Sequence, residues 1–539
     1  ARAIACGACL ALPLGSPLDA QAVGGSGTDA RQLPAGAWRY AIGGIWDGHS
    51  EIAENGTARP YLGRLATDAF GSRHVPQLAP AEAAIRTLAG APSYSLSLGP
   101  LEALGDARQS IAPITIERGL TRRLSLSLTV PYVESRDNAR LILNRDGTGA
   151  NVGQNTAYTS AAVRLNNGTI LRQFALARAS LAAEIARCTP AAAANCDAIR
   201  ANPSSAQQLL LDALAAQNAL ATLYGDSVRA GSPVVPIVGS SEFAAITARI
   251  GTLRSAFASL GISAIDATSL PAAATFVNGP GGLPRMAKDS AYGLNYDVLG
   301  GTRRAGIGDI DLTASYLLIN TVGDRPVDWI NTRRFGVRSQ LTGGWRFGTA
   351  GADRTNTAFD VPIGDGAAAL LVRSTTDVVF SSRFWMSGTV RLVQPLSDNA
   401  VLRRPLYADS SVFFPTSVGR ATRSLGRRAE VEVVPRVVIG RFFALTAGYQ
   451  LAHNDASSYA FDATDSLPAE TLTIGSRTAQ SMVLGFTFST LSSYLRNRAK
   501  FPLEVFFTHV APVTASGDRT PRVATDRLEL RIYTDFPRR

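Results

Sequence analysis

Charged side chains recur at every second position in several segments of the chain that are otherwise apolar. In the segment 527–536, RLELRIYTDF, charged residues alternate with leucine and isoleucine. Alternation with a period of two places one set of side chains on one face of a β-strand. Charges of both signs on the inner faces of several strands could form rings that select solutes. They could equally pair across neighbouring strands and brace a wall, and the sequence leaves both interpretations open.

The candidate lumen-lining residues share this inward position and come from different segments of the chain. They are Asp309, Asp311, Arg334, Arg338, Arg346, Arg373, Asp377, Arg391, Glu430, Glu432, Arg436, Arg527, Glu529 and Arg531.

Histidines are the residues most suited to acid–base catalysis, and the chain has four: His49, His74, His453 and His509. A hydrolase built on a barrel would pair a nucleophile with histidine near the outer rim. The segments 49–51 and 453–455 fall where outer loops should begin, but they lack the extended motifs of outer-membrane phospholipases and proteases. We therefore predict that the protein is not an enzyme, that it has no catalytic residues, and that these are exposed loop histidines.

Metal and cofactor motifs are also weak. The glycines of the segment 306–309, GIGD, precede a strand rather than a helix, so no helix N-terminus is available to hold a phosphate. Acidic turns such as 144–147 lack the spaced ligands of a calcium loop. We predict no cofactor and no metal site. Cys188 and Cys196 lie close together and suit a local disulfide in an oxidising compartment.

The strands that would carry these charges are long. In the segment 123–133, RLSLSLTVPYV, leucine, valine and tyrosine alternate with arginine, serine and threonine, and the segments 310–318 and 335–347 repeat the pattern. A soluble sandwich also alternates. Strands of roughly ten residues or more with charges on the inner face suit a membrane barrel with a polar lumen better.

The whole chain predicts an all-β, transmembrane antiparallel β-barrel of about twelve strands. The expected strands are 37–47, 107–118, 123–133, 310–318, 335–347, 372–382, 385–393, 429–439, 443–451, 479–488, 503–510 and 527–536. Long and short connections alternate between them without a break. Bacterial barrels have short periplasmic turns and longer outer loops, so this alternation supports the prediction and places the protein in the bacterial outer membrane.

Four regions follow from this assignment. Residues 1–22 read as a signal-peptide remnant, with a basic residue, a short apolar stretch and an A-x-A-like cleavage site. Residues 23–139 form the N-terminal part of the barrel, 140–302 an α-helical insertion in an extracellular loop, and 303–536 the C-terminal part of the barrel. After the first few residues, no apolar run is long enough for a membrane-spanning helix.

The insertion is rich in alanine and has helical periodicity, with apolar residues three and four positions apart in 170–185 and 243–260. A further helix is expected over 205–224. The insertion could be a small bundle that packs on itself. It could instead be a lid over a pore or a knob that binds a protein partner.

The composition limits the choice of partners. The net charge is +11 and 46% of residues are hydrophobic, with a mean hydropathy of +0.07. A barrel with only alternate residues in lipid should show such a value. The basic residues are scattered and are not interleaved with aromatics, so nucleic-acid binding is not expected. We expect arginines to line the lumen and to face the anionic head groups of outer-membrane lipid.

Two segments, ITIERGLTRRLSLSLTVPYV and GIGDIDLTASYLLI, resemble the outer-membrane transporter family associated with the meta-pathway of phenol degradation. A strand, a short glycine turn, a strand ending in Pro-Tyr and a later Gly-x-Gly-Asp strand recur there in this order. The resemblance implies a porin-like channel for passive uptake of small, hydrophobic or aromatic solutes. The alternative is a structural or surface-display barrel that presents the helical insertion for partner binding.

Overall fold

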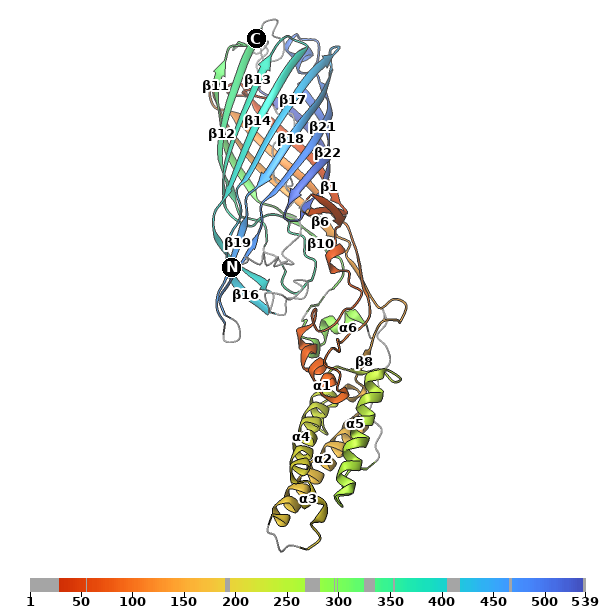
Figure 1. Cartoon of the computed structure of the whole chain (residues 1–539). Coiled ribbons are helices and arrows are strands. Elements are labelled where there is room, and N and C mark those ends of the chain that lie inside the picture. The colour runs from red at the N-terminus through yellow and green to blue at the C-terminus, as the bar shows by residue number, and fades with distance from the viewer. Residues whose placement is uncertain are drawn as a thin grey trace. The chain divides into compact units, whose positions relative to one another are not determined.

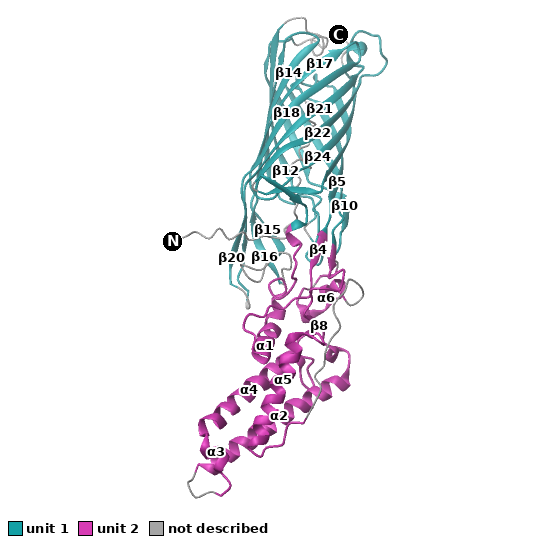
Figure 2. Ribbon diagram, turned by 45° about the vertical axis from the view of Figure 1, so that its right-hand side comes forward, with its two compact units in different colours: residues 1–63, 104–140, 298–539 teal, residues 64–103, 141–297 magenta. Residues whose placement is uncertain are grey.

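The structure is a computed structural model. It describes residues 29–54, 56–189, 194–266, 282–294, 296–297, 299–323, 335–351, 354–404, 417–464 and 468–536. The predicted signal segment 1–22 and the candidate residue Arg334 lie outside these residues. The chain divides into two compact units, coloured teal and magenta in Figure 2. Unit 1 comprises 1–63, 104–140 and 298–539, and unit 2 comprises 64–103 and 141–297.

Unit 1 is a closed, antiparallel β-barrel (Figure 1). The twelve strands that form its wall are β1 (Trp38–His49), β5 (Ala107–Gly119), β6 (Leu124–Asp137), β11 (Ile310–Asn320), β12 (Gly336–Phe347), β13 (Ala369–Val379), β14 (Phe384–Pro395), β17 (Arg428–Ile439), β18 (Phe443–Asn454), β21 (Arg477–Ser489), β22 (Leu503–Gly517) and β24 (Ala524–Thr534). Each pairs with the next, and β24–β1 and β5–β6 pairings complete the ring. A short strand, β10 (Arg303–Ile307), also pairs with β6. The predicted twelve-stranded barrel is confirmed.

The barrel has an apolar outside and a polar inside, the reverse of a soluble domain. On β6, Leu126 and Leu128 are 43% and 41% exposed, whereas Ser125 and Thr129 are buried. Neighbouring strands repeat this order because their registers place like faces side by side: Leu126 and Leu128 lie opposite Ala314 and Leu312 of β11. The outward set therefore forms a continuous apolar surface that suits lipid, as a membrane barrel requires.

Connections at the two ends of the barrel differ in length. The short-turn end carries the β5–β6, β13–β14 and β17–β18 turns, of which the last contains Gly440 at a positive φ of 68°. Exposed phenylalanines cluster here: the ring centroids of Phe380 and Phe384 are 5.3 Å apart, and those of Phe443 and Phe488 are 5.4 Å apart. β11 and β21 also end at the short-turn end, where β12 and β22 begin, and the long-loop end carries the other connections. Aromatic girdles of this kind mark the edges of the membrane-facing band.

A second, four-stranded sheet lies at the long-loop end of the barrel. It pairs β15 (Asp398–Arg404), β16 (Ser417–Ser424), β19 (Ser457–Phe461) and β20 (Glu470–Ile474) in that order. Its own small core contains Leu402, Tyr459 and Phe461. A further small sheet consists of β2 (Glu51–Glu54), β3 (Thr57–Pro60) and β23 (Thr520–Pro521).

Helix α7 (Leu491–Leu495) lies in the β21–β22 connection at the short-turn end. Leu491 and Leu495 pack with Leu33, Tyr533 and Phe536. The last described residues of the chain therefore join the N-terminal segment in one apolar cluster.

Unit 2 is mainly helical. Its helices are α1 (Ala79–Ala89), α2 (Ala161–Cys188), α3 (Asp197–Ala201), α4 (Pro203–Tyr224), α5 (Ser241–Ser259) and α6 (Leu283–Lys288), and its short strands are β4 (Leu101–Leu104), β7 (Arg140–Leu143), β8 (Val152–Gln154) and β9 (Val234–Pro236). The Ser160 hydroxyl accepts a hydrogen bond from the Val163 amide and so caps α2. Cys188 and Cys196 form a disulfide with a Cα–Cα distance of 5.5 Å.

Residues 64–103 belong to unit 2, although the sequence pattern had placed them in the barrel. They contain α1, which packs against α4 and α5. Their lack of strand periodicity is the signal that would have separated them. In the part of the chain that the structure describes, no helix has both the length and the apolar character needed to cross a membrane.

Candidate functional site

An extended N-terminal segment, residues 29–36, lies inside the barrel at the short-turn end. The Arg31 guanidinium donates to both carboxylate oxygens of Glu504 on β22, at 3.1 and 3.2 Å. The Ala30 amide donates to Oδ2 of Asp377 on β13, at 3.0 Å. The segment therefore reaches side chains on opposite parts of the wall and occupies the lumen at this end.

The same segment is itself highly charged. Asp29 forms ion pairs with Arg31, at 2.7 Å, and with Arg436 of β17, at 3.3 Å. Nε2 of Gln340 on β12 donates to Oε1 of Gln32, at 2.7 Å. All of these side chains are buried, so polar contacts hold the segment in place together with the apolar packing of Leu33.

A loop occupies the opposite, long-loop end of the lumen. It joins β12 to β13 over residues 348–368, of which 352–353 lie outside the described part. Ile363 packs with Ile45, Ile111 and Val133 on the inner wall. The Pro362 carbonyl accepts hydrogen bonds from the Gln109 amide group, at 3.2 Å, and from the Ser135 hydroxyl, at 3.1 Å.

Two carboxylates fasten this loop. Asp309 accepts hydrogen bonds from the amides of Ala350 and Asp365, at 2.9 and 2.8 Å, and burial raises the pKa of Asp309 above its ordinary value. Asp365 pairs with Arg428, at 2.5 Å. Burial alone would raise the pKa of Asp365, but the Arg428 guanidinium outweighs it and holds that pKa below the usual range.

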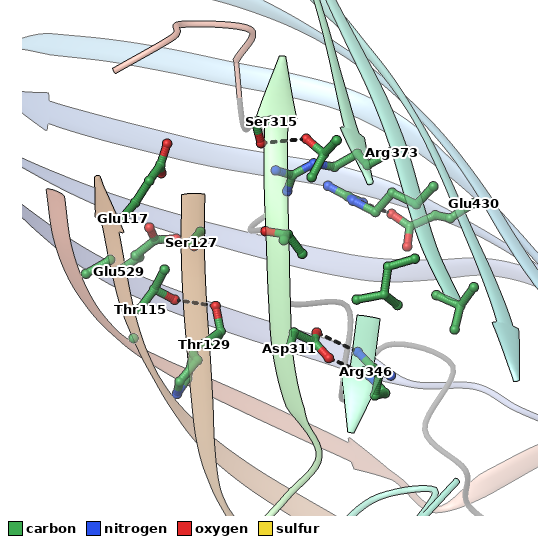
Figure 3. A pocket seen from close by; sticks show the side chains of 18 of the residues that line it. Thr115, Glu117, Ser127, Thr129, Asp311, Ser315, Arg346, Arg373, Glu430 and Glu529 are labelled. Carbon is green, nitrogen blue, oxygen red and sulfur yellow. Dashed lines mark hydrogen bonds and ion pairs between the residues drawn. The ribbon is translucent and has the colours of Figure 1, made fainter. Parts of the chain in front are cut away.

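Between the N-terminal segment and the loop lies a cavity of about 190 Å³. Its lining comes from many strands of the barrel and includes eight arginines and five carboxylates. Figure 3 shows Asp311 paired with Arg346, and Arg373 and Glu430 pointing into the same space. Gly43 in the lining leaves space that a larger residue would fill, because a Cβ at this position would lie 3.0 Å from Cγ of Pro113. This cavity is the candidate functional site.

Three arginines of the cavity pair with carboxylates on neighbouring strands. Arg346 donates to both oxygens of Asp311, at 2.7 and 2.9 Å, and Arg391 pairs with Glu430 and Glu432. Arg39 pairs with Glu117. Buried, two-point arginine–carboxylate pairs hold neighbouring strands in register. Arg373 differs, because no carboxylate among the described residues lies within ion-pair distance of it, and its Nε is buried with no hydrogen-bond partner in that part of the chain.

The structure divides the described candidate residues between the cavity, the N-terminal segment and two further positions. Those that line the cavity are Asp311, Arg346, Arg373, Arg391, Glu430, Arg527, Glu529 and Arg531. Arg338, Asp377 and Arg436 lie instead beside the N-terminal segment, where Arg338 pairs with Asp377 at 3.0 Å. Glu432 binds Arg391 from the same wall. Asp309 precedes β11 and binds the loop rather than facing open lumen.

Several charges of the lumen were missed from the sequence. Glu117 and Glu504 occupy inward positions within the expected strands 107–118 and 503–510, so applying the period-two pattern to these strands would have found both. Asp29 and Arg31 carry no such signal. They precede the first strand, and nothing in DARQLPAG indicates that it lies inside a barrel.

The histidines differ from the prediction in their location. His49 ends β1 and His453 lies in β18, so both are in strands rather than loops. The His49 ring packs edge-on against Tyr61, with centroids 5.1 Å apart, and His453 hydrogen-bonds to the Thr478 hydroxyl at 2.8 Å. Within the described residues, no group of three or more His, Cys, Asp or Glu side chains is arranged to hold a metal ion.

No family model matches the chain, and no curated protein matches it in sequence. An outer membrane channel from Pseudomonas putida F1 aligns with a TM-score of 0.40 and 8% identity, over 95% of this chain and 100% of that one. The P. putida toluene transporter TodX aligns with a TM-score of 0.26 and 9% identity, over 93% of this chain and 90% of that one. A Pseudomonas aeruginosa FadL homologue aligns with a TM-score of 0.27 and 8% identity, over 94% of each chain. Likenesses of this size assign neither a family nor a solute to the chain.

The class of protein follows from the chain's own structure. Twelve antiparallel strands close into a ring, apolar side chains cover its outer face, and charged side chains fill its interior. Such a surface is stable only where lipid surrounds it, and closed barrels are one of the two structures that can span a bilayer. The chain is a β-barrel protein of the bacterial outer membrane.

Proposed function

We propose that the barrel is a channel for the passive uptake of small solutes of hydrophobic or aromatic character. The observation that carries the proposal is the lumen cavity of about 190 Å³ between the N-terminal segment and the loop 348–368. A barrel that served only as an anchor could fill this space with side chains, as small barrels do. Here the two obstructions are segments outside the strands, which can shift without breaking the wall.

The interactions of the two segments support a gated route. Hydrogen bonds and ion pairs join each segment to the wall, and such contacts can be exchanged for water when a segment moves. If the short-turn end faces the periplasm, as in bacterial barrels, a solute would pass the loop first and the N-terminal segment last. The likeness of two sequence segments to a transporter family linked to phenol degradation favours an aromatic solute.

A cysteine pair can test the proposal directly. Gln32 of the N-terminal segment and Gln340 of the wall touch through their side chains, so Gln32→Cys together with Gln340→Cys can be bridged by a short thiol crosslinker. In porin-deficient cells, the unbridged variant should raise the uptake rate of radiolabelled toluene several-fold over cells without the protein. Bridging should return uptake to background, while the same treatment of the wild type should change nothing.

A surface-display barrel predicts otherwise. It should give no uptake above background in either state, because its lumen would serve only to support the wall. Uptake that is equal in the bridged and unbridged states would instead show that solute does not pass the N-terminal segment.

A further inference from the structure

Among the described residues of the cavity, Arg373 is an arginine that neither wall bracing nor the ion pairs of the two segments explain. It projects inward from β13, opposite Arg391 on β14 and Thr342 on β12. Three of the charged residues that act most strongly on Arg373 are basic, namely Arg391, Arg39 and Arg531, and one, Glu117, is a carboxylate. Glu117 is already engaged, because it pairs with Arg39 and accepts a hydrogen bond from the Ser125 hydroxyl.

The cavity lining has three more arginines than carboxylates, but two of these arginines, Arg31 and Arg428, pair with Glu504 and Asp365 just outside the lining. Arg373 has no such ion pair among the described residues. The Nε donor of Arg373 is buried without a partner among the described residues, which costs free energy unless an acceptor satisfies it. Arginine presents a planar fork that matches a carboxylate at two points. The charge and the geometry both fit a ligand that brings its own carboxylate.

The surroundings of Arg373 also define what the rest of the ligand should be. Leu371 occupies the next lumen-facing position of β13, two residues before Arg373. It lies opposite Val393, its register partner on β14, and both line the cavity. An apolar patch therefore lies directly next to the guanidinium. A cavity of about 150 Å³ can hold a benzene ring, so a site of about 190 Å³ has room for one ring and a carboxylate.

We propose that Arg373 is the centre of a binding site for small organic anions with one carboxylate and an apolar body of about one aromatic ring. The carboxylate binds the Arg373 guanidinium, and the ring lies against Leu371 and Val393. The proposal rests on the proposed uptake function, to which it adds the charge and size of the solute. A purely hydrophobic solute would leave Arg373 unsatisfied.

The test is equilibrium binding of benzoate to the purified, full-length protein in detergent, with benzyl alcohol as the neutral comparison. Benzoate should bind the wild type saturably, and Arg373→Gln should weaken it about tenfold or more, the usual loss for a charge-assisted hydrogen bond. Arg373→Lys should weaken it less. Arg383→Gln is the matched control, because this arginine lies exposed in the β13–β14 turn, and it should bind benzoate like the wild type.

A second variant keeps Arg373 in place and decides the question even if Arg373→Gln does not fold. Thr342 lies inward and directly opposite Arg373, so Thr342→Asp supplies an internal carboxylate that should displace benzoate. Thr342→Asn, of nearly equal size but neutral, should bind it. Benzyl alcohol should bind all folded variants alike.

Equal benzoate affinity in Thr342→Asp and Thr342→Asn would overturn the proposal, as would the absence of saturable benzoate binding to the wild type. Failure of the channel function would appear separately. The protein would then bind benzoate as predicted but give no uptake of benzoate or toluene in cells.

Discussion

Arg31 and Glu504 lie 473 positions apart in the sequence and form an ion pair inside the barrel, with Nη1 and Oε1 3.1 Å apart. The Tyr533 hydroxyl donates to the other oxygen of Glu504, at 2.6 Å. The pair thus joins the segment before the first strand to the seam formed by the last two strands. The position of the N-terminal segment therefore depends on a small number of polar contacts in addition to the packing of Leu33.

Breaking this pair should loosen the segment. We predict that Glu504→Gln raises the single-channel conductance in planar bilayers at least about twofold, because a hydrogen bond to a charged group contributes roughly 1.5–3 kcal/mol. Glu134→Gln breaks the exposed pair with Arg303 and should leave the conductance unchanged. If the two variants conduct alike, the segment is not held by Glu504.

The outer face of the barrel should tolerate no charge. Val390 lies near the middle of β14 and is 42% exposed on the apolar surface. Val390→Arg should lower the free energy of unfolding in lipid vesicles by about 2–4 kcal/mol, the cost of arginine at mid-bilayer. Val390→Leu is the matched control and should stay within about 0.5 kcal/mol. Equal stability of the two variants would mean that this face is not in lipid.

The cross-strand pairs brace the wall, and Asp311 with Arg346 is a clear example. Asp311→Asn leaves a buried guanidinium without its charge partner, which costs about 3–5 kcal/mol. Replacing both residues by leucine should cost less, since no unpaired charge remains. Asp106→Asn, in the exposed pair with Arg108, should cost at most about 1 kcal/mol. Urea unfolding of the three variants measures these differences. A double variant as unstable as Asp311→Asn would contradict the account.

The loop 348–368 should respond to pH in a defined direction. The pKa of Asp365 is held below its ordinary value, mainly by Arg428 against the effect of burial. The ion pair therefore stabilises the loop at every pH above the ordinary carboxyl pKa, and this stabilisation is lost as the pH falls through the lowered pKa. Asp309 has a raised pKa and protonates first, which relieves the cost of its buried charge and does not weaken the fold.

Hydrogen exchange of the amides in 348–368, corrected for the intrinsic rate, measures this response. Protection should stay constant from pH 8 down to about pH 4 and fall below that. Asp365→Asn should lower protection across the whole range. A wild-type loop that loses protection between pH 8 and pH 5 would show that another group controls it.

The wall of the barrel was predictable from sequence because lipid imposes one rule on every strand. Leu126, Leu128 and Ile532 must alternate with polar residues wherever the strand crosses the membrane, and all twelve expected segments overlap a strand of the ring. The second sheet was not foreseen, since strands such as β19 are short and lie outside the band where the rule applies.

The candidate site was predictable only in part. Inward charges such as Arg373 and Asp311 follow from the same alternation, but pairing depends on the register between strands, which the sequence does not specify. Arg31 and Ile363 reach the lumen from irregular segments, whose course depends on tertiary contacts. The sequence therefore indicated which side chains face inward, but not that two segments enclose a cavity or that Arg373 has no ion-pair partner in the described part of the chain.

The central claim is that solute passes through the lumen and that the N-terminal segment controls the passage. Current through single molecules of the Gln32→Cys, Gln340→Cys variant in a planar bilayer tests it most directly. We predict discrete current steps before the thiol crosslinker is added, their loss when the segment is fixed to β12, and their return after cleavage of the bridge. Steps that persist at the same amplitude with the segment fixed, or no steps in any state, would contradict this account.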